Sequence, residues 1–423
     1  MRKQHLVNFI VPCLVLNLFL MRPSALGQSF QALSLGIAVV LCALHLILRR
    51  PTVLVTTPQA KKEMRWYMTA FFLFWIYEIP LTLIDQSNLD FVIKEFVSAL
   101  VTFVCYGLVL VQFDENKRFF RFLCTVIALI GASSGITILL GSTIGYERLL
   151  LTHISVAGYD GGMLDNGIGT GSLYFPLSML YSKFTSGSVE LMRFNGFFRE
   201  AGIYQAVACF CIVYEYFTRR SKLVMIGAAV GVIAAFSSLG ILLLIMIFGA
   251  IIIMRIRGFL LKLVLVSVLA IAAYPVALYV PYIGLEAKQG THSTSITDRT
   301  EAMGNVWGVL SEHPLGSGLF NGQQANSGIT LIAATGQLGI IGFLLQVFML
   351  SGWRVQRGRA ELLKIMMCAP LLITALISQP IAGSPIMYVL PMISMISPSR
   401  KKLENQPNET RLRTLKKPLQ TRT

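Results

Sequence analysis

Long apolar runs separated by short polar segments form the main pattern of this chain. Each run is long enough, or pairs closely enough with a neighbouring run, to cross a bilayer as a helix. The pattern predicts an all-α polytopic integral membrane protein with about 12 transmembrane helices. The runs lie near residues 6–21, 29–48, 67–84, 91–112, 119–141, 200–217, 223–236, 239–254, 259–280, 327–350, 365–382 and 384–397.

The first of two longer polar segments lies at about residues 142–199. It is rich in glycine, and its one apolar stretch, 173–180, contains Pro176 and is too short to span a bilayer. We expect this stretch to form an interfacial or re-entrant element.

The second polar segment lies at about residues 281–326. Its pattern predicts a helix over about 297–312. Pro314 and the turn Gly316-Ser317-Gly318 follow, and such residues end a helix and reverse the chain.

Composition supports a membrane protein. At 423 residues, with 55% hydrophobic and only 13% charged residues, the chain is too apolar for a soluble protein of its size. The mean hydropathy of +0.67 favours the same class. The seven cysteines all lie in apolar runs, where we interpret them as small buried hydrophobic residues. No Cys or His spacing fits a metal site, so neither a metal nor another cofactor is expected.

The net charge of +16 could indicate nucleic-acid binding, but the basic residues cluster at the ends of apolar runs. Seven such clusters hold 28 of the 36 Lys and Arg residues. The positive-inside rule therefore predicts that these clusters and both chain termini are cytoplasmic, and that both long polar segments are periplasmic. Residues 1–398 then form a single transmembrane domain, and residues 399–423 form a basic cytoplasmic tail.

The first candidate site precedes the predicted helix 200–217 and contains Arg193, Asn195, Arg199 and Glu200. Two arginines six residues apart could direct two guanidinium groups at one phosphate. The amide groups at the start of the helix would reinforce such an anion site. The alternative is that these arginines only anchor the chain at the membrane interface.

The second candidate site contains Arg299, Glu301, Trp307 and His313. Glu301 and His313 could each accept a proton at neutral pH. A histidine directly before a proline also fits a purely structural position at the end of a helix, and that alternative remains open for His313.

One acidic residue falls inside a predicted span. Glu78 lies in the sequence Tyr77-Glu78-Ile79-Pro80, where a carboxylate is costly in lipid. Lys94 opens the next span, so a structural Glu78–Lys94 ion pair is one interpretation, and a position beside a substrate path is the other.

Three stretches together resemble the O-antigen polymerase/ligase superfamily, which includes the Wzy-type bacterial polysaccharide polymerases. Their order and spacing carry the resemblance, which covers roughly residues 190–350 in detail. The stretches are Arg193-x-x-Gly196-x-Phe198-x-Glu200, then Arg299, Met303 and Trp307 followed by His313–Gly318, and then Ala325-Asn326 followed by Gly336–Gly342.

The resemblance implies transfer of a glycan from a polyprenyl-diphosphate carrier to a sugar hydroxyl at the periplasmic face of the bacterial inner membrane, without a metal. It implies membrane lipid as the surroundings, and a flippase and a chain-length regulator of the same pathway as partners. Residues are then assigned to two roles. Catalysis falls to Arg193, Glu200, Arg299, Glu301 and His313, and substrate binding to Asn195, Arg199, Trp307 and Asn326.

The chain departs from the family pattern at some positions, and these departures help to choose among the functions found in the family. Ala325 stands where ligases of the family carry a functional histidine, which favours a polymerase that joins repeat units over an O-antigen-type ligase. The turn Ser237-Ser238-Leu239 lacks the arginine that the family often carries there. A lipid-linked-glycan flippase is less favoured because charges concentrate in the polar loops. An assembly role without catalysis also remains open.

Overall fold

The fold is that of a computed structural model, which describes most of the chain. The described residues are 2–48, 58–84, 89–156, 170–186, 189–256, 293–319, 330–351, 359–379, 381 and 383–395, with a few positions between 258 and 268. The predicted run 259–280 therefore falls mostly outside the described residues, and the predicted tail 399–423 falls entirely outside them.

The chain is mostly helical, and most apolar runs form helices as predicted. The helices before the first polar segment are α1 (Arg2–Asn17), extended by the 3-10 helix η1 (Leu18–Leu20), α2 (Gly27–Leu48), α3 (Pro58–Ile84), α4 (Leu89–Leu110) and α5 (Phe113–Ile144). Those after it are α6 (Ala201–Phe217), α7 (Lys222–Ala234), α8 (Ser238–Arg255), α11 (Ser293–Glu312), α12 (Thr335–Ser351) and α13 (Arg359–Ile377).

Five helices within the described ranges are long and apolar enough to cross a membrane: α2, α3, α4, α5 and α8. Five further apolar helices are shorter, at Asn8–Leu20, Ala201–Phe217, Lys222–Ala234, Thr335–Ser351 and Leu363–Ile377. The chain is therefore a multi-pass membrane protein by length and composition. The prediction of about 12 spans stays a prediction.

The last predicted run, 384–397, does not form a spanning helix. It consists of α14 (Pro385–Val389) and the 3-10 helix η5 (Leu390–Met395). Its residues from Ile386 to Val389 are at most 3% exposed, so the bundle encloses this irregular segment. Irregular backbone at membrane depth is tolerated where protein covers it, which explains how an apolar run can be buried without spanning.

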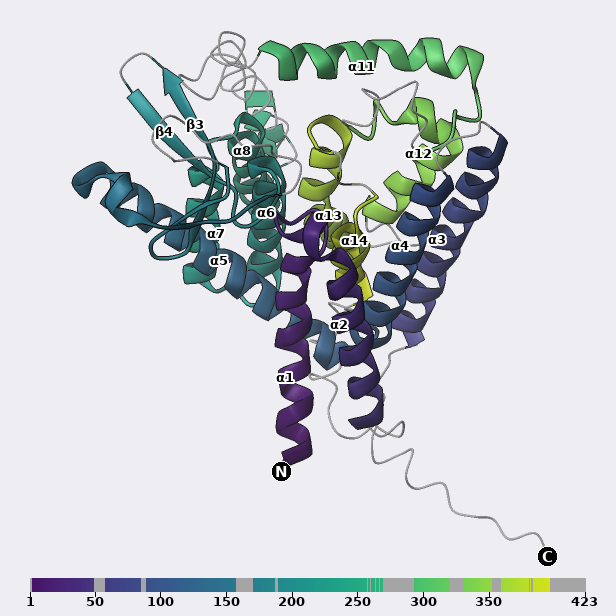
Figure 1. Ribbon diagram of the computed structural model, residues 1–423, viewed down its shortest axis with the longest axis horizontal. Helices are drawn as coiled ribbons and strands as arrows, with labels where there is room; N and C mark the ends of the chain where they lie inside the picture. Colours follow the sequence, from purple (N-terminus) through teal and green to yellow (C-terminus); the bar gives the residue numbers. More distant parts are fainter. Residues whose placement is uncertain are drawn as a thin grey trace, which may run out of the picture.

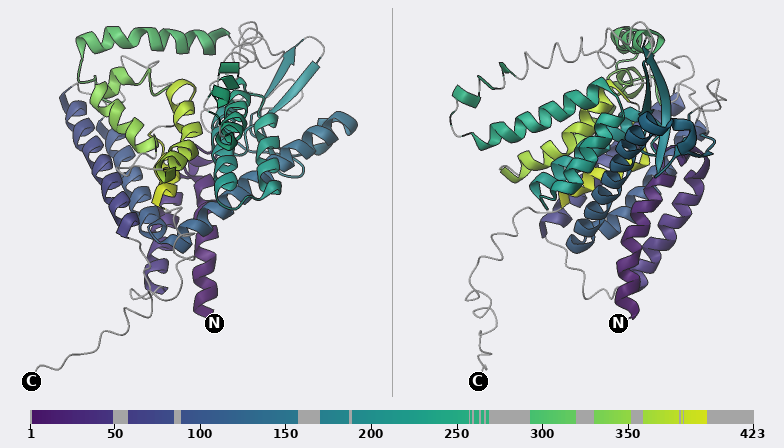
Figure 2. Two further views of the ribbon diagram at one scale, coloured as in Figure 1. Left: turned by 180° about the vertical axis from the view of Figure 1, so that it is seen from behind. Right: turned by 90° about the vertical axis from the view of Figure 1, so that its left-hand side faces the viewer.

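Both polar segments lie at one end of the bundle. Figure 1 shows the hairpin strands β3 (Ser178–Ser186) and β4 (Val189–Phe194) and helix α11 at the top, whereas α1 begins at the bottom. The two views in Figure 2 show the same arrangement from behind and from the side. Helix α11 lies across the bundle rather than along it, and it packs on α12.

Helix α6 is the centre of the bundle. Every residue from Ala201 to Glu215 is buried, and α6 packs against α5, α7, α8 and α13. The predicted burial of the cysteines is confirmed for Cys209 and Cys211, which lie on this helix. Because α6 is covered on all sides, the residues at its start are held in a fixed position.

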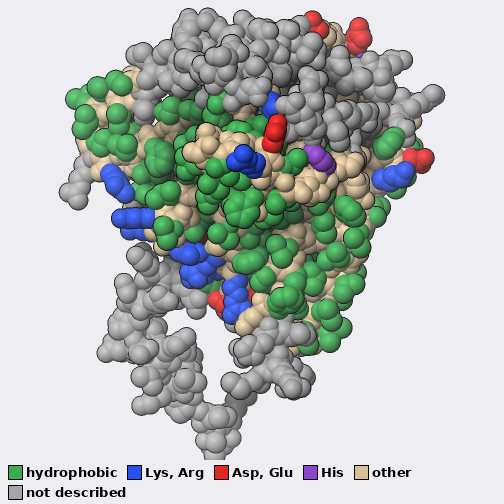
Figure 3. All heavy atoms as spheres, turned by 60° about the vertical axis from the view of Figure 1, so that its left-hand side comes forward, with side chains coloured by type: hydrophobic (Ala, Val, Ile, Leu, Met, Phe, Trp, Pro, Cys, Tyr) green, Lys and Arg blue, Asp and Glu red, His purple; other side chains and the backbone are tan. Residues whose placement is uncertain are grey.

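The outer faces of the other helices are apolar and exposed. Ile47 is 78% exposed, Ile84 74%, Leu139 71% and Leu223 83%. Figure 3 shows a broad belt of hydrophobic side chains, with several Lys and Arg side chains gathered at its lower margin. An apolar belt bordered by basic residues is the surface expected of helices in lipid.

The first polar segment contains a sheet, which the sequence analysis did not predict. Strands β1 (Leu150–His153), β2 (Ser172–Tyr174), β3 and β4 form a four-stranded antiparallel sheet in sequence order. The stretch 173–180 is therefore strand and turn, and its interfacial or re-entrant placement stays a prediction. The sheet forms because one of its faces can be buried: Tyr174, Leu180 and Phe194 are fully buried in a small core beside it.

Candidate functional site

The turn after α11 packs backbone to backbone on a break in α12. Ser317 N donates to the carbonyl oxygen of Gly336 at 3.1 Å, and Gly318 N donates to that of Gln337 at 3.1 Å. Gly339 breaks the helix with φ 63° and ψ 176°, a conformation essentially restricted to glycine. The two glycine-containing stretches noted in the sequence are thus one structural unit.

The α1–α2 connection is joined in a similar way to the start of α6. Arg199 N donates to the Pro23 carbonyl oxygen at 2.9 Å, and Ala25 N donates to the Phe197 carbonyl oxygen at 2.8 Å. These bonds hold Arg22 beside Arg199, although the two residues are far apart in the sequence.

A cavity of about 440 Å³ lies between these two units. Its volume falls in the usual range of small-ligand sites, roughly 300–1,000 Å³. Its lining combines apolar side chains with charged, amide and hydroxyl side chains. The lining includes Arg22, Gln28, Phe74, Glu95, Arg199, Glu200, Ile203, Leu319, Thr330, Leu331, Gln337, Leu338 and Gln346.

Four charged residues lie in the described wall, two arginines and two glutamates. Arg22 forms an ion pair with Glu95 of α4. Glu200 is the N-cap residue of α6, yet its side chain makes no capping hydrogen bond. Its carboxylate is therefore not committed to the helix and lies at the cavity, next to Arg199.

Arg199 and Glu200 are the predicted site residues that line the cavity. Arg193 and Asn195 are not among its lining residues. Arg193 lies 5.3 Å from the Tyr181 ring centroid, and its Nε donates to the Ala235 carbonyl oxygen at 3.4 Å. Asn195 is fully buried. Arg193 thus attaches the sheet to the turn between α7 and α8.

Among the predicted residues in and directly after α11, those with described side chains do not line the cavity either. Glu301 and His313 are exposed, and Trp307 is 78% exposed. The backbone of Arg299 belongs to α11, but its side chain lies outside the described residues, as does all of Asn326. The His313 carbonyl oxygen accepts from Gly316 N at 2.8 Å, a position at the end of the helix as the structural alternative predicts.

Glu78 and Lys94 do not pair in the described structure. The Lys94 ammonium lies 5.5 Å from the centroid of the Phe91 ring. Glu78 is fully buried, and neither carboxylate oxygen has a hydrogen-bond partner among the described residues. A different ion pair forms at the next residue of α4, where Glu95 contacts Arg22.

Sequence reasoning missed several polar residues of the described lining, among them Arg22, Glu95, Gln337 and Gln346. A signal existed for Arg22, because it is one of the few basic residues outside the predicted cytoplasmic clusters. The cavity combines residues from α3, α4, α6 and α12, and no local pattern indicates which helices meet.

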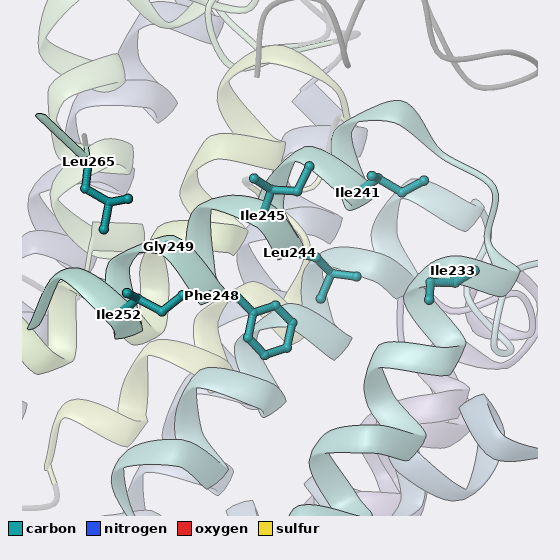
Figure 4. A pocket seen from close by; sticks show the side chains of 8 residues that line it. All are labelled: Ile233, Ile241, Leu244, Ile245, Phe248, Gly249, Ile252 and Leu265. Carbon is teal, nitrogen blue, oxygen red and sulfur yellow. The ribbon is translucent and has the colours of Figure 1, made fainter. Parts of the chain in front are cut away.

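A second cavity, of about 550 Å³, is lined only by apolar residues and glycine. In Figure 4, Ile241, Leu244, Phe248 and Ile252 extend along α8, with Ile233 on the neighbouring α7. Its described lining is therefore suited to contact with hydrocarbon.

Within the described residues, no group of three or more His, Cys, Asp or Glu side chains could hold a metal ion. The described lining of the first cavity supplies guanidinium, carboxylate, amide and hydroxyl groups. Comparison of the chain with protein-family models, with curated proteins and with solved structures finds no match.

Proposed function

We propose that this protein is a polysaccharide polymerase that joins polyprenyl-diphosphate-linked oligosaccharide repeat units at the periplasmic face of the bacterial inner membrane. The product would be an exopolysaccharide, a capsule or an O-antigen. A flippase would supply the lipid-linked units, and a chain-length regulator would act on the product.

One observation carries the proposal: two arginines from distant segments and two glutamates line one cavity that apolar side chains also line. A polyprenyl-diphosphate donor has a strongly anionic group joined directly to hydrocarbon. Arg22 and Arg199 match the first part, and Phe74, Ile203 and Leu338 match the second.

The proposed reaction is a single displacement. The acceptor hydroxyl oxygen attacks the anomeric carbon of the donor, and the bond from that carbon to the diphosphate oxygen breaks. The diphosphate leaves with the bonding electron pair, and its charge is stabilised by Arg199 and Arg22. Glu200 takes the proton of the attacking hydroxyl, and the anomeric configuration is inverted.

Surface glycan from a deletion strain tests the proposal. The strain should accumulate single repeat units on the carrier lipid, and the wild-type gene should restore polymer. The Arg199→Ala variant should not restore it, whereas Arg148→Ala, at an exposed arginine outside the cavity wall, should. Protein levels in the membrane fraction are matched by immunoblot.

The same strain separates the rival functions. Long chains that are not attached to their final acceptor would indicate a ligase. Loss of the outward-facing pool of lipid-linked units would indicate a flippase. Either result, or normal polymer from Arg199→Ala at normal protein level, would overturn the proposal.

A further inference from the structure

The Arg22–Glu95 ion pair is part of the cavity wall. The side chains are 33% and 15% exposed, so both groups remain accessible from the cavity. They come from different elements, because Arg22 lies in the α1–α2 connection and Glu95 lies on α4. An ion pair at this position directly controls how much positive charge the cavity offers to a ligand.

The backbone of Arg22 is fixed on both sides of its side chain. Its N–H donates to Gln31 Oε1 at 2.9 Å, and its carbonyl oxygen accepts from Ile386 N at 3.4 Å. Gln31 in turn donates to Ser98 Oγ at 2.6 Å, one turn from Glu95 on α4. The two partners are therefore held at close range, and only their side chains can separate.

The carboxylate of Glu95 competes with any anion for Arg22. A monoanionic phosphodiester would replace one charge–charge contact with another and gain little. A diphosphate carries more charge and can engage the guanidinium groups of Arg22 and Arg199 together, so it can displace the carboxylate. The Glu95 carboxylate thus weakens the binding of singly charged anions more than that of multiply charged anions, and this difference in affinity gives specificity.

We propose that Glu95 is a specificity-determining residue that reserves Arg22 for diphosphate groups and excludes monoanionic phosphodiesters. The bundle has exposed apolar outer faces suited to lipid, and phosphodiester head groups in a bilayer greatly outnumber any carrier diphosphate. The identification of the natural ligand as a lipid diphosphate rests on the proposed function, but the discrimination between the two kinds of anion does not.

Binding to the purified full-length protein in an uncharged detergent tests the proposal. Isothermal titration calorimetry is run with inorganic pyrophosphate, farnesyl diphosphate and dimethyl phosphate. The wild type should prefer pyrophosphate to dimethyl phosphate by at least about tenfold. Glu95→Gln should bind dimethyl phosphate about tenfold more tightly, with a smaller gain for pyrophosphate, so that the preference falls.

Two variants control the measurement. Asp90→Asn makes the same change of acid to amide at an exposed position of α4 and should leave the preference unchanged. Arg22→Gln should weaken pyrophosphate binding at least tenfold. If Glu95→Gln unfolds, Glu95→Asp, which shortens the reach of the carboxylate, should lower the preference in the same direction.

The outcomes are distinct. An unchanged preference in a folded Glu95 variant, or pyrophosphate binding that does not depend on Arg22, would overturn the proposal. Tighter binding of farnesyl diphosphate than of pyrophosphate would indicate that the ligand is a lipid-linked diphosphate. Equal binding of the two would indicate that the site recognises a diphosphate free of lipid. Failure of the polymerase assay would leave the binding result standing, so the two proposals fail separately.

Discussion

The hydroxyl of Tyr77 on α3 donates a hydrogen bond to the Leu315 carbonyl oxygen, across 238 positions of the chain. Leu315 belongs to the turn that packs on the break in α12, so this one bond connects α3 to both. The neighbouring Gly316 and Gly339 allow this contact. A Cβ at Gly339 would meet the Leu315 carbonyl oxygen, and a Cβ at Gly316 would meet the Gln337 carbonyl oxygen.

The first prediction concerns Gly339. Gly339→Ala should destabilise the protein by about 1–3 kcal/mol from backbone strain alone, with a further loss from the clash. It should also disturb Gln337 and Leu338 in the cavity wall. Gly304→Ala is the matched control, because a Cβ there meets nothing within 4 Å, and it should be neutral or gain roughly 0.5–1 kcal/mol. Thermal unfolding in detergent compares them, and equal melting temperatures for the two variants would contradict the contact.

The second prediction concerns the ion pair between Lys364 of α13 and Glu63 of α3, whose side chains are each 3% exposed. Lys364→Met leaves a buried carboxylate without this partner and should cost about 3–5 kcal/mol. The double variant Lys364→Met with Glu63→Met should recover part of that loss, because it removes both charges. The free energy of unfolding is measured for the single and double variants. A double variant less stable than the single one would argue against a paired, desolvated contact.

The third prediction separates Arg193 from Arg199. Arg199→Ala should lower glycan transfer about a hundredfold with little change in melting temperature. Arg193→Ala removes a hydrogen bond to the α7–α8 turn and the contact with Tyr181, each of which contributes roughly 1 kcal/mol. It should therefore lower stability first. Melting curves and polymer assays on both variants separate the structural role from the catalytic one. Full stability of Arg193→Ala together with complete loss of polymer would instead support a direct role of Arg193 in glycan transfer.

The fourth prediction concerns the orientation of the chain in the membrane. Single cysteines are placed at Arg148 and Gly308, in the two polar segments, and at Lys117 and Arg219, at the opposite ends of helices, in a variant without native cysteines. A membrane-impermeant maleimide should label the first pair from the periplasm and the second pair only after lysis. The reverse result would invert the orientation derived from the positive charges.

Sequence patterns predicted the helices well because apolar run length determines them directly. The runs 29–48 and 91–112 match α2 and α4 to within two residues at each end. The sheet was missed because Leu173 to Leu180 is apolar on both faces of a short hairpin, and glycine-rich flanks hid the alternation. The run 384–397 was predicted as a spanning helix because a segment buried among neighbouring helices is as apolar as one in contact with lipid.

The candidate site was predicted only in part. Arg199 and Glu200 could be found because they directly precede a helix and Arg199 lies outside the seven basic clusters. Arg22, Glu95 and Gln346 could not be grouped, because their proximity depends on how helices pack and not on spacing. The same limit explains the Glu78–Lys94 prediction, since a shift of one residue along α4 turns a side chain to a different face.

Reconstitution in liposomes measures the proposed polymerisation itself. The purified protein is placed in liposomes with polyprenyl-diphosphate-linked repeat units as the only glycan, and the products are separated on a gel. The proposed function predicts a ladder of chains that lengthen by whole repeat units, absent with Arg199→Ala and present with Arg148→Ala. Single units left unchanged by the folded wild-type protein would contradict it.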